Sequence, residues 1–187
     1  GNRLAPQVVA ERDIPPGSAG PDIYCTFLGE GRNGSVAVTE WKTGVRNFHS
    51  AGKVQASSEP HDMRLQRLLG HLSALAHPKP ESVLVVACGA GVTAGTVVTH
   101  PDVKRIVICD IEPLVPRCVA PMFAHENHEV VKDPRTEIVC DDGRHFVRTT
   151  REKFDIITSD PIDPWVKGCA ALNTVEYYEM CQARLRP

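Results

Sequence analysis

A long hydrophobic run is absent from the sequence. No stretch within its 187 residues approaches the roughly 18 apolar residues that are needed to cross a bilayer. The beginning of the chain also lacks the basic-then-apolar order of a secretory signal. We therefore expect no membrane segment within this chain and a cytoplasmic location.

An excess of positive charge is lacking as well. The 21 lysines and arginines are scattered along the chain and are balanced by 23 acidic residues, which gives a formal net charge of −2. Proteins that follow the phosphates of nucleic acids concentrate basic residues on one surface. We therefore expect no nucleic acid among the partners of this protein.

The seven cysteines form no C-x-x-C pair. Such pairs mark many metal and redox sites, and without them cysteine behaves as a small apolar residue. Three of the seven lie inside or beside apolar runs, which fits a protein of a reducing compartment. We also expect no metal site, because His125 and His128 have acidic neighbours but no third ligand at a suitable spacing.

The residues that are present have the composition of a globular domain, with 42% hydrophobic and 24% charged residues. Residues 1–22 are rich in proline and glycine, and we interpret them as a linker or extended arm. Residues 23–60 hold strand patterns at 35–39, 45–49 and 53–56, which predict a small antiparallel β unit. Residues 61–187 are interpreted as a Rossmann-like nucleoside-binding domain.

A helix is predicted to begin at Pro60 and to end before Pro78. Its apolar residues recur at helical spacing, and they are Met63, Leu65, Leu68, Leu69, Leu72 and Leu75. We expect this stripe of leucines to face the core.

Beyond this helix, strands and helices alternate. Strands are predicted at 83–88, 106–110, 136–140 and 154–159, and helices at 92–99, 113–126, 143–150 and 173–184. Such alternation predicts an α/β fold with a Rossmann-like parallel sheet wound by helices. A complete methyltransferase-type sheet has seven strands, so we expect this one to be truncated at its C-terminal side.

Two of the predicted strands end in residues that suit a nucleotide. The apolar run from Val83 ends in Gly89 and Gly91, and the run from Ile106 ends at Asp110. Glycines allow a tight turn into a helix whose N–H groups face a ligand, and an acid at the next strand end reaches the ribose. Asp110 follows Gly91 by 19 residues, close to the roughly 20 expected. A tight turn without a ligand also needs glycine and is the alternative.

A loop with two carboxylates follows the last predicted strand. Asp160 and Asp163 lie there with prolines and Trp165. Charge and ring contact could hold a cationic amine while one carboxylate acts as a base, although Asp and Pro are also ordinary loop formers. Because ligands in such sheets lie at the carboxyl ends of the strands, we expect this loop, the glycines, Asp110 and residues 141–143 to converge.

An ordered series of motifs connects these features. It comprises Gly-Lys-Val-Gln (52–55), a helix start near Asp62, His-Pro (77–78), Val-Leu-Val-Val-Ala-Cys-Gly-Ala-Gly (83–91), Ile-Cys-Asp-Ile-Glu (108–112), Asp-Asp-Gly (141–143) and Phe-Asp-Ile-Ile-Thr-Ser-Asp-Pro-Ile-Asp-Pro (154–164). From about Gly34 onward, the chain resembles the spermidine synthases, which are polyamine aminopropyltransferases. The similarity is strongest to their divergent bacterial, spermidine-synthase-like branch.

The resemblance implies a role for each matching residue. It assigns the nucleoside to Gln55, Gly89, Gly91, Asp110, Ile111, Asp142 and Gly143, with Gln55 and Asp110 on the ribose and Asp142 on the adenine amine. It assigns Asp160 as the catalytic base, with Asp163, Gln66 and Trp165 as substrate contacts. It further implies a homodimer and an amine as the acceptor substrate.

The implied reaction is an in-line displacement without a metal. A neutral amine attacks the aminopropyl carbon of decarboxylated S-adenosylmethionine, and methylthioadenosine leaves. Typical spermidine synthases have an aspartate where this chain has Ala90, so intact S-adenosylmethionine remains an alternative donor. A small-molecule methyltransferase and a non-catalytic nucleoside-binding or assembly module are the alternative functions.

Overall fold

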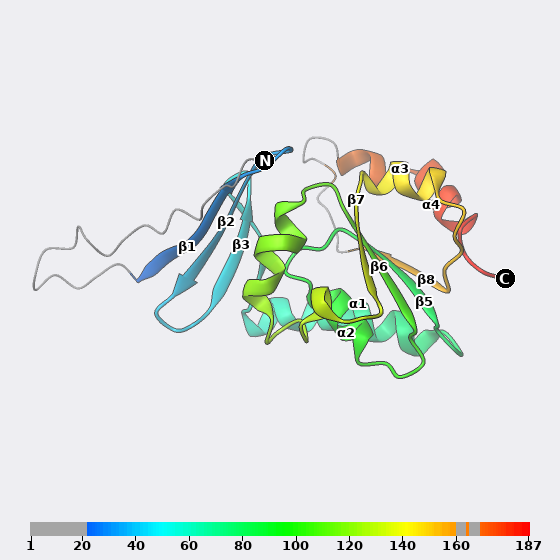
Figure 1. The fold of residues 1–187 in the computed structure, drawn as a ribbon, viewed down its shortest axis with the longest axis horizontal. Helices are drawn as coiled ribbons and strands as arrows, with labels where there is room; N and C mark the ends of the chain where they lie inside the picture. Colours follow the sequence, from blue (N-terminus) through cyan, green and yellow to red (C-terminus); the bar gives the residue numbers. More distant parts are fainter. Residues whose placement is uncertain (1–21, 160–163, 165–168) are drawn as a thin grey trace, which may run out of the picture.

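The computed structural model describes residues 22–159, 164 and 169–187, and within them it contains two sheets (Figure 1). The first sheet is antiparallel, in the order β1-β2-β3-β4, with β1 (Ile23–Glu30), β2 (Ser35–Trp41), β3 (Arg46–Ser50) and β4 (Lys53–Ser57). Ala51 and Gly52 both have positive φ in the two-residue turn between β3 and β4, as a tight hairpin of this twist requires.

The second sheet is parallel and has the order β7-β6-β5-β8. Its strands are β5 (Ser82–Val86), β6 (Arg105–Asp110), β7 (Thr136–Cys140) and β8 (Ile156–Ser159). From β5 the chain proceeds through β6 and β7 on one side and then returns to β8 on the other side. The predicted α/β class with a Rossmann-like parallel sheet is therefore confirmed, and the strand order reverses between β5 and β8.

Helices cover both faces of the parallel sheet (Figure 1). On one face lie α1 (Pro60–Ala76) and α2 (Val92–Val98), and on the other lie α3 (Gly143–Thr149) and α4 (Val175–Gln182). Successive residues of β5 alternate between two buried clusters, with Val83 and Val85 in one and Leu84 and Val86 in the other. This alternation explains why the strand has an unbroken apolar sequence.

The two sheets share one hydrophobic core. Val36, Val38 and Phe48 of the antiparallel sheet belong to the same buried cluster as β5 and α2. Polar contacts add to this packing, because Arg46 of β3 donates hydrogen bonds to Glu40 of β2 and to Glu126, which lies in the segment between β6 and β7. The antiparallel sheet is thereby held against the carboxyl edge of the parallel sheet.

The expected orientation of the leucine stripe in α1 is wrong. The buried residues of this helix are Met63, Gln66, Gly70 and Ala74, whereas Leu65, Leu68, Leu72 and Leu75 are between 45% and 73% exposed. A Cβ at Gly70 would lie 2.7 Å from the carbonyl oxygen of Thr93, so the helices touch through their small residues. The periodicity predicted the helix correctly but not which side of it is covered.

Two further elements differ from the prediction. The helix predicted over 113–126 is replaced by a π turn, η2 (Val115–Val119), and a 3-10 turn, η3 (Ala120–Phe123). Pro116 and Pro121 lie in these turns, and each removes a backbone N–H that a continuous α-helix would use. Strand β1 was not predicted because a bulge at Thr26 breaks its pairing with β2 and its alternation is poor.

The part of the chain that the structure describes contains no helix long and apolar enough to span a membrane.

The contact between α1 and α2 leads to a stability prediction. Gly70→Ala should lower the free energy of unfolding by about 1–3 kcal/mol, because the added methyl group overlaps Thr93 and Thr96. Leu72→Ala should change it by less than about 0.5 kcal/mol, because that side chain is largely exposed. Urea denaturation of both variants measures the difference. Equal losses would contradict the packing described for α1.

A second prediction concerns pH. His71 Nδ1 and His100 Nε2 lie 3.0 Å apart between α1 and the end of α2, and burial, followed by the charge of His71, lowers the pKa of His100. The folded state therefore binds fewer protons than the unfolded state. The contribution of His100 to stability should be complete above about pH 6.5 and should fall as the pH drops below that value.

His100→Gln should reduce this loss, whereas His61→Gln, at an exposed position of α1, should not. Urea midpoints between about pH 7.5 and pH 5.5 measure the effect. The same pH dependence in both variants would contradict the role of the histidine pair.

Candidate functional site

The parallel strands bring four chain segments to one edge of the sheet. The glycine turn follows β5, Asp110 ends β6, residues 141–143 follow β7, and Ser159 ends β8. Neighbouring strands are in register at this edge, where Val86 pairs with Cys109 and with Ser159. The reversal of strand order between β5 and β8 makes this edge the expected ligand position in an open α/β sheet.

The turn after β5 has an unusual backbone. Ala87, Gly89 and Gly91 all have positive φ, at 70°, 53° and 79°. Such a conformation costs a residue with a Cβ about 1–2 kcal/mol, and strain of this kind often accompanies functional sites. A Cβ at Gly89 would meet nothing within 4 Å. Gly89 therefore borders open space, and its glycine identity follows from its φ rather than from crowding by the protein.

Asp110 contacts this turn directly. It is buried, and its Oδ2 accepts a hydrogen bond of 2.7 Å from the backbone N–H of Cys88 while its Oδ1 accepts one of 2.8 Å from the N–H of Glu112. Burial raises the pKa of Asp110, the two N–H donors oppose this, and the charge of Glu112 adds to it. The carboxylate thus links the end of β6 to the glycine turn, and each oxygen retains a second lone pair for a ligand.

The turn after β7 contributes Asp142 and Gly143. Asp142 is exposed and caps α3, because its Oδ1 accepts from the N–H of His145 at 2.9 Å. A Cβ at Gly143 would overlap Val86, so packing against β5 accounts for this glycine. Both residues have structural roles at the predicted edge, and contact with adenine stays a prediction.

The two glutamines occupy different surroundings. Gln55 is exposed on β4 at a bulge, because Phe48 pairs with Ala56 and His49 pairs with Val54, which leaves Gln55 without a partner across the ladder. Gln66 is buried, and its Nε2 donates to the carbonyl oxygen of Ser57 at 3.3 Å. The amide of Gln66 therefore joins α1 to β4, and the predicted contact with substrate stays a prediction.

Ile111 and Glu112 connect the strand end to the antiparallel sheet. The side chain of Ile111 is exposed, and its carbonyl oxygen accepts a bond of 2.7 Å from Asn33 Nδ2. Glu112 is buried, and its Oε2 accepts the N–H of Asn33 at 2.9 Å. The turn between β1 and β2 is therefore anchored beside Asp110.

The remaining predicted site residues, Asp160, Asp163 and Trp165, lie outside the described residues.

Sequence reasoning missed two groups at the turn. Cys88 donates its backbone N–H to Asp110, and burial raises the pKa of its thiol, so it is not an activated nucleophile. Asn127 is fully buried and donates to the carbonyl oxygen of Ala90. Its sequence neighbourhood carries no pattern that points to the glycine turn.

Metal ligands do not gather in the described part of the chain, where no group of three or more His, Cys, Asp or Glu side chains could hold an ion. His125 is exposed, and its neighbour Glu126 forms an ion pair with Arg46.

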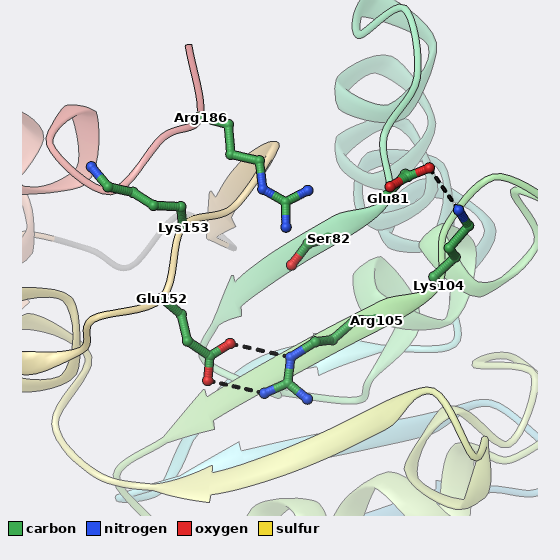
Figure 2. Close-up of a pocket in the computed structure, with 7 residues that line it drawn as sticks. All are labelled: Glu81, Ser82, Lys104, Arg105, Glu152, Lys153 and Arg186. Atoms are coloured by element: carbon green, nitrogen blue, oxygen red, sulfur yellow. Dashed lines mark hydrogen bonds and ion pairs between the residues drawn. The ribbon is translucent and has the colours of Figure 1, made fainter.

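The pocket in Figure 2 lies at the opposite edge of the sheet. It has a volume of about 260 Å³ and is bounded by the amino ends of β5 and β6 and by the segment before β8. Two ion pairs lie within it, one between Lys104 and Glu81 and one between Arg105 and Glu152. A second hollow of about 590 Å³ runs along α1 beside Arg64 and His71. Neither contains the strand ends that carry the predicted nucleoside residues.

The chain is similar in sequence to known proteins. The spermine/spermidine synthase domain profile matches residues 62–187. The polyamine aminopropyltransferase of Thermotoga petrophila is 31% identical over 133 residues, which are 71% of this chain and 45% of that protein. Polyamine aminopropyltransferase 2 of Pseudomonas aeruginosa is 34% identical over 139 residues, which are 73% of this chain and 39% of that protein.

Solved structures agree with this result. A spermidine synthase in complex with the transition state analogue AdoDATO has a TM-score of 0.78 at 26% identity, over 87% of this chain and 55% of that one. The spermidine synthase of Thermotoga maritima has a TM-score of 0.75 at 26% identity, over 87% of this chain and 54% of that one. The chain spans less than half the length of the curated relatives above. The matched domain covers most of the chain, and the chain belongs to the spermine/spermidine synthase family.

Proposed function

We propose that the protein carrying this chain transfers an aminopropyl group from decarboxylated S-adenosylmethionine to an amine and releases methylthioadenosine. The observation that carries this proposal is the buried carboxylate of Asp110 beside the open face of Gly89. An acid at that position can accept hydrogen bonds from ribose hydroxyls while the glycine backbone admits the nucleoside. The matching relatives are polyamine aminopropyltransferases.

The nucleoside contacts extend along the strand ends. Asp110 binds the ribose, Ile111 lies beside it with an exposed apolar side chain, and the exposed carboxylate of Asp142 accepts from the adenine amine. Gln55 reaches the ribose from the bulge of β4. The position of Asp110, Ile111 and Asp142 at the carboxyl ends of β6 and β7 supports these assignments.

The chemical step is a displacement at the carbon next to sulfonium. The lone pair of the neutral amine forms the C–N bond, the C–S bond breaks, and its electron pair stays on sulfur. Asp160 takes the proton that the attacking nitrogen loses, and Asp163 holds the second amine. A free amine with a pKa near 10 is mostly protonated at neutral pH, so a carboxylate base is required. Alignment of the reacting atoms then supplies much of the rate.

Ala90 bears on the choice of donor. Its side chain is buried and uncharged, so this position offers no carboxylate to the aminopropyl ammonium. The charge on Asp160 and Asp163 would have to serve the ammonium groups of both donor and acceptor. We expect the affinity for decarboxylated S-adenosylmethionine to depend on these two residues more than on the glycine turn.

The activity is tested by mixing the purified protein with decarboxylated or intact S-adenosylmethionine and a linear diamine. Methylthioadenosine should form only with the decarboxylated donor and only when the amine is present. Formation of adenosylhomocysteine from the intact donor would show methyl transfer and would contradict the proposal. Tight binding of either donor without a product would indicate a non-catalytic module.

The base is tested by Asp160→Asn. Turnover should fall at least about 100-fold, because the amide cannot accept the proton. The affinity for methylthioadenosine should change by less than about threefold, because the base contacts the acceptor and not the nucleoside. Asp102→Asn, at an exposed position before the amino end of β6, is the matched control. Retained turnover in the first variant would remove Asp160 from the mechanism.

The ribose contact is tested by Asp110→Asn. The variant should bind methylthioadenosine at least about tenfold more weakly. Its side-chain NH2 group would face one of the two backbone N–H donors, and only one oxygen would remain to accept a hydrogen bond from the ribose. Asp133→Asn is the control, since Asp133 pairs with Arg135 before the amino end of β7. Calorimetry measures the affinities of both variants, and unchanged affinity in Asp110→Asn would argue against the ribose assignment.

A further inference from the structure

Asn127 is a buried polar residue to which the proposed reaction gives no role. Its side chain is fully buried, and its Nδ2 donates to the carbonyl oxygens of Ala90 at 2.8 Å and Ala120 at 2.7 Å. Two carbonyl oxygens on the nitrogen side fix the orientation of the amide, because a flipped amide would face them with its own oxygen.

The oxygen of the same side-chain amide is in an unusual environment. Asn127 Oδ1 has no hydrogen-bond partner among the described residues. A buried acceptor without a partner is unfavourable, and a native protein that retains one usually has a reason. An apolar side chain would avoid this penalty but could not hold the carbonyl group of Ala90.

One glycine of the turn and one glycine of α2 lie against Asn127. A Cβ at Gly91 would lie 2.9 Å from Asn127 Nδ2, and a Cβ at Gly95 would overlap the backbone oxygen of Asn127. Gly91 and Gly95 therefore allow close approach of Asn127, whereas Gly89 faces open space. The residues after Asn127 are strained as well, because His128 and Glu129 both have positive φ, at 55° and 53°.

We propose that Asn127 is a positioning residue that holds the Ala90 peptide so that the face of Gly89 is preorganised for the nucleoside. The amide acts through the turn and does not touch the ligand. The proposal rests on the proposed function as far as the identity of the ligand is concerned. The contact with the turn exists without a ligand and can be tested separately.

The first measurement is affinity for methylthioadenosine by calorimetry. Asn127→Ala should bind at least about tenfold more weakly than the unmodified protein, because the turn is no longer held in its binding conformation. Asn127→Asp should do the same, because a carboxylate would face two carbonyl oxygens. Val103→Ala is the control, since Val103 is buried in the same hydrophobic cluster as Ala90 but lies before the amino end of β6. It should lower the melting temperature yet keep the affinity within about threefold.

The second measurement uses the ligand-free protein labelled with ¹⁵N-glycine. In Asn127→Ala the amide signals of Gly89 and Gly91 should shift or broaden, whereas those of Gly44 and Gly52 in the antiparallel sheet should stay in place. Val103→Ala should leave all four signals unchanged. If the unmodified protein does not bind methylthioadenosine, the proposed ligand is wrong, and these glycine signals still decide the role of Asn127.

Several results would overturn the proposal. One is unchanged glycine signals in a folded Asn127→Ala protein. Another is an affinity loss in Val103→Ala as large as that in the Asn127 variants. If neither Asn127 variant folds, the residue is required for folding and its assignment to the turn is lost.

Discussion

The site depends on the carboxylate of Asp110, which lies where two strands of the parallel sheet end. Its two oxygens accept backbone N–H groups from the glycine turn and from the residue two positions further along the chain. Hydrogen bonds to an ionised acceptor are stronger than those between neutral groups. The Asp110 carboxylate, which we propose as the ribose contact, therefore also stabilises the conformation of the glycine turn, where we propose that the rest of the nucleoside binds. The residue that we propose for ribose binding thus also has a structural role, and its burial raises the pKa of the carboxyl group.

The antiparallel sheet is coupled to the same point. Glu112, two residues after Asp110, accepts from Asn33 in the turn between β1 and β2, and a Cβ at Gly31 would overlap the Glu112 carboxylate. Apolar residues of both sheets share one core. The bulge at Gln55 therefore belongs to a sheet that is anchored beside Asp110. The contact between Gln55 and the ribose that we propose depends on this anchoring.

Much of this arrangement could be predicted from the sequence, because parallel strands have a strong local signature. The runs Val83–Val86 and Ile106–Cys109 are apolar throughout, and the register of the strands then brings their ends together. The side of α1 that is covered could not be predicted, because small residues at Gly70 and Ala74 pack while the leucines remain exposed. Asn127 was missed for a different reason. It meets Ala90 across 37 residues of sequence, and no local pattern encodes such a contact.

The central claim is that the carboxyl ends of β5, β6 and β7 form a nucleoside site with Asp110 on the ribose. A crystal structure with methylthioadenosine tests it most directly. We expect density for the ribose hydroxyls within hydrogen-bond distance of Asp110 and for the adenine beside Asp142, with the hydrogen bond from Cys88 to Asp110 retained. A ligand bound elsewhere, or one bound at this edge without contact to Asp110, would contradict it.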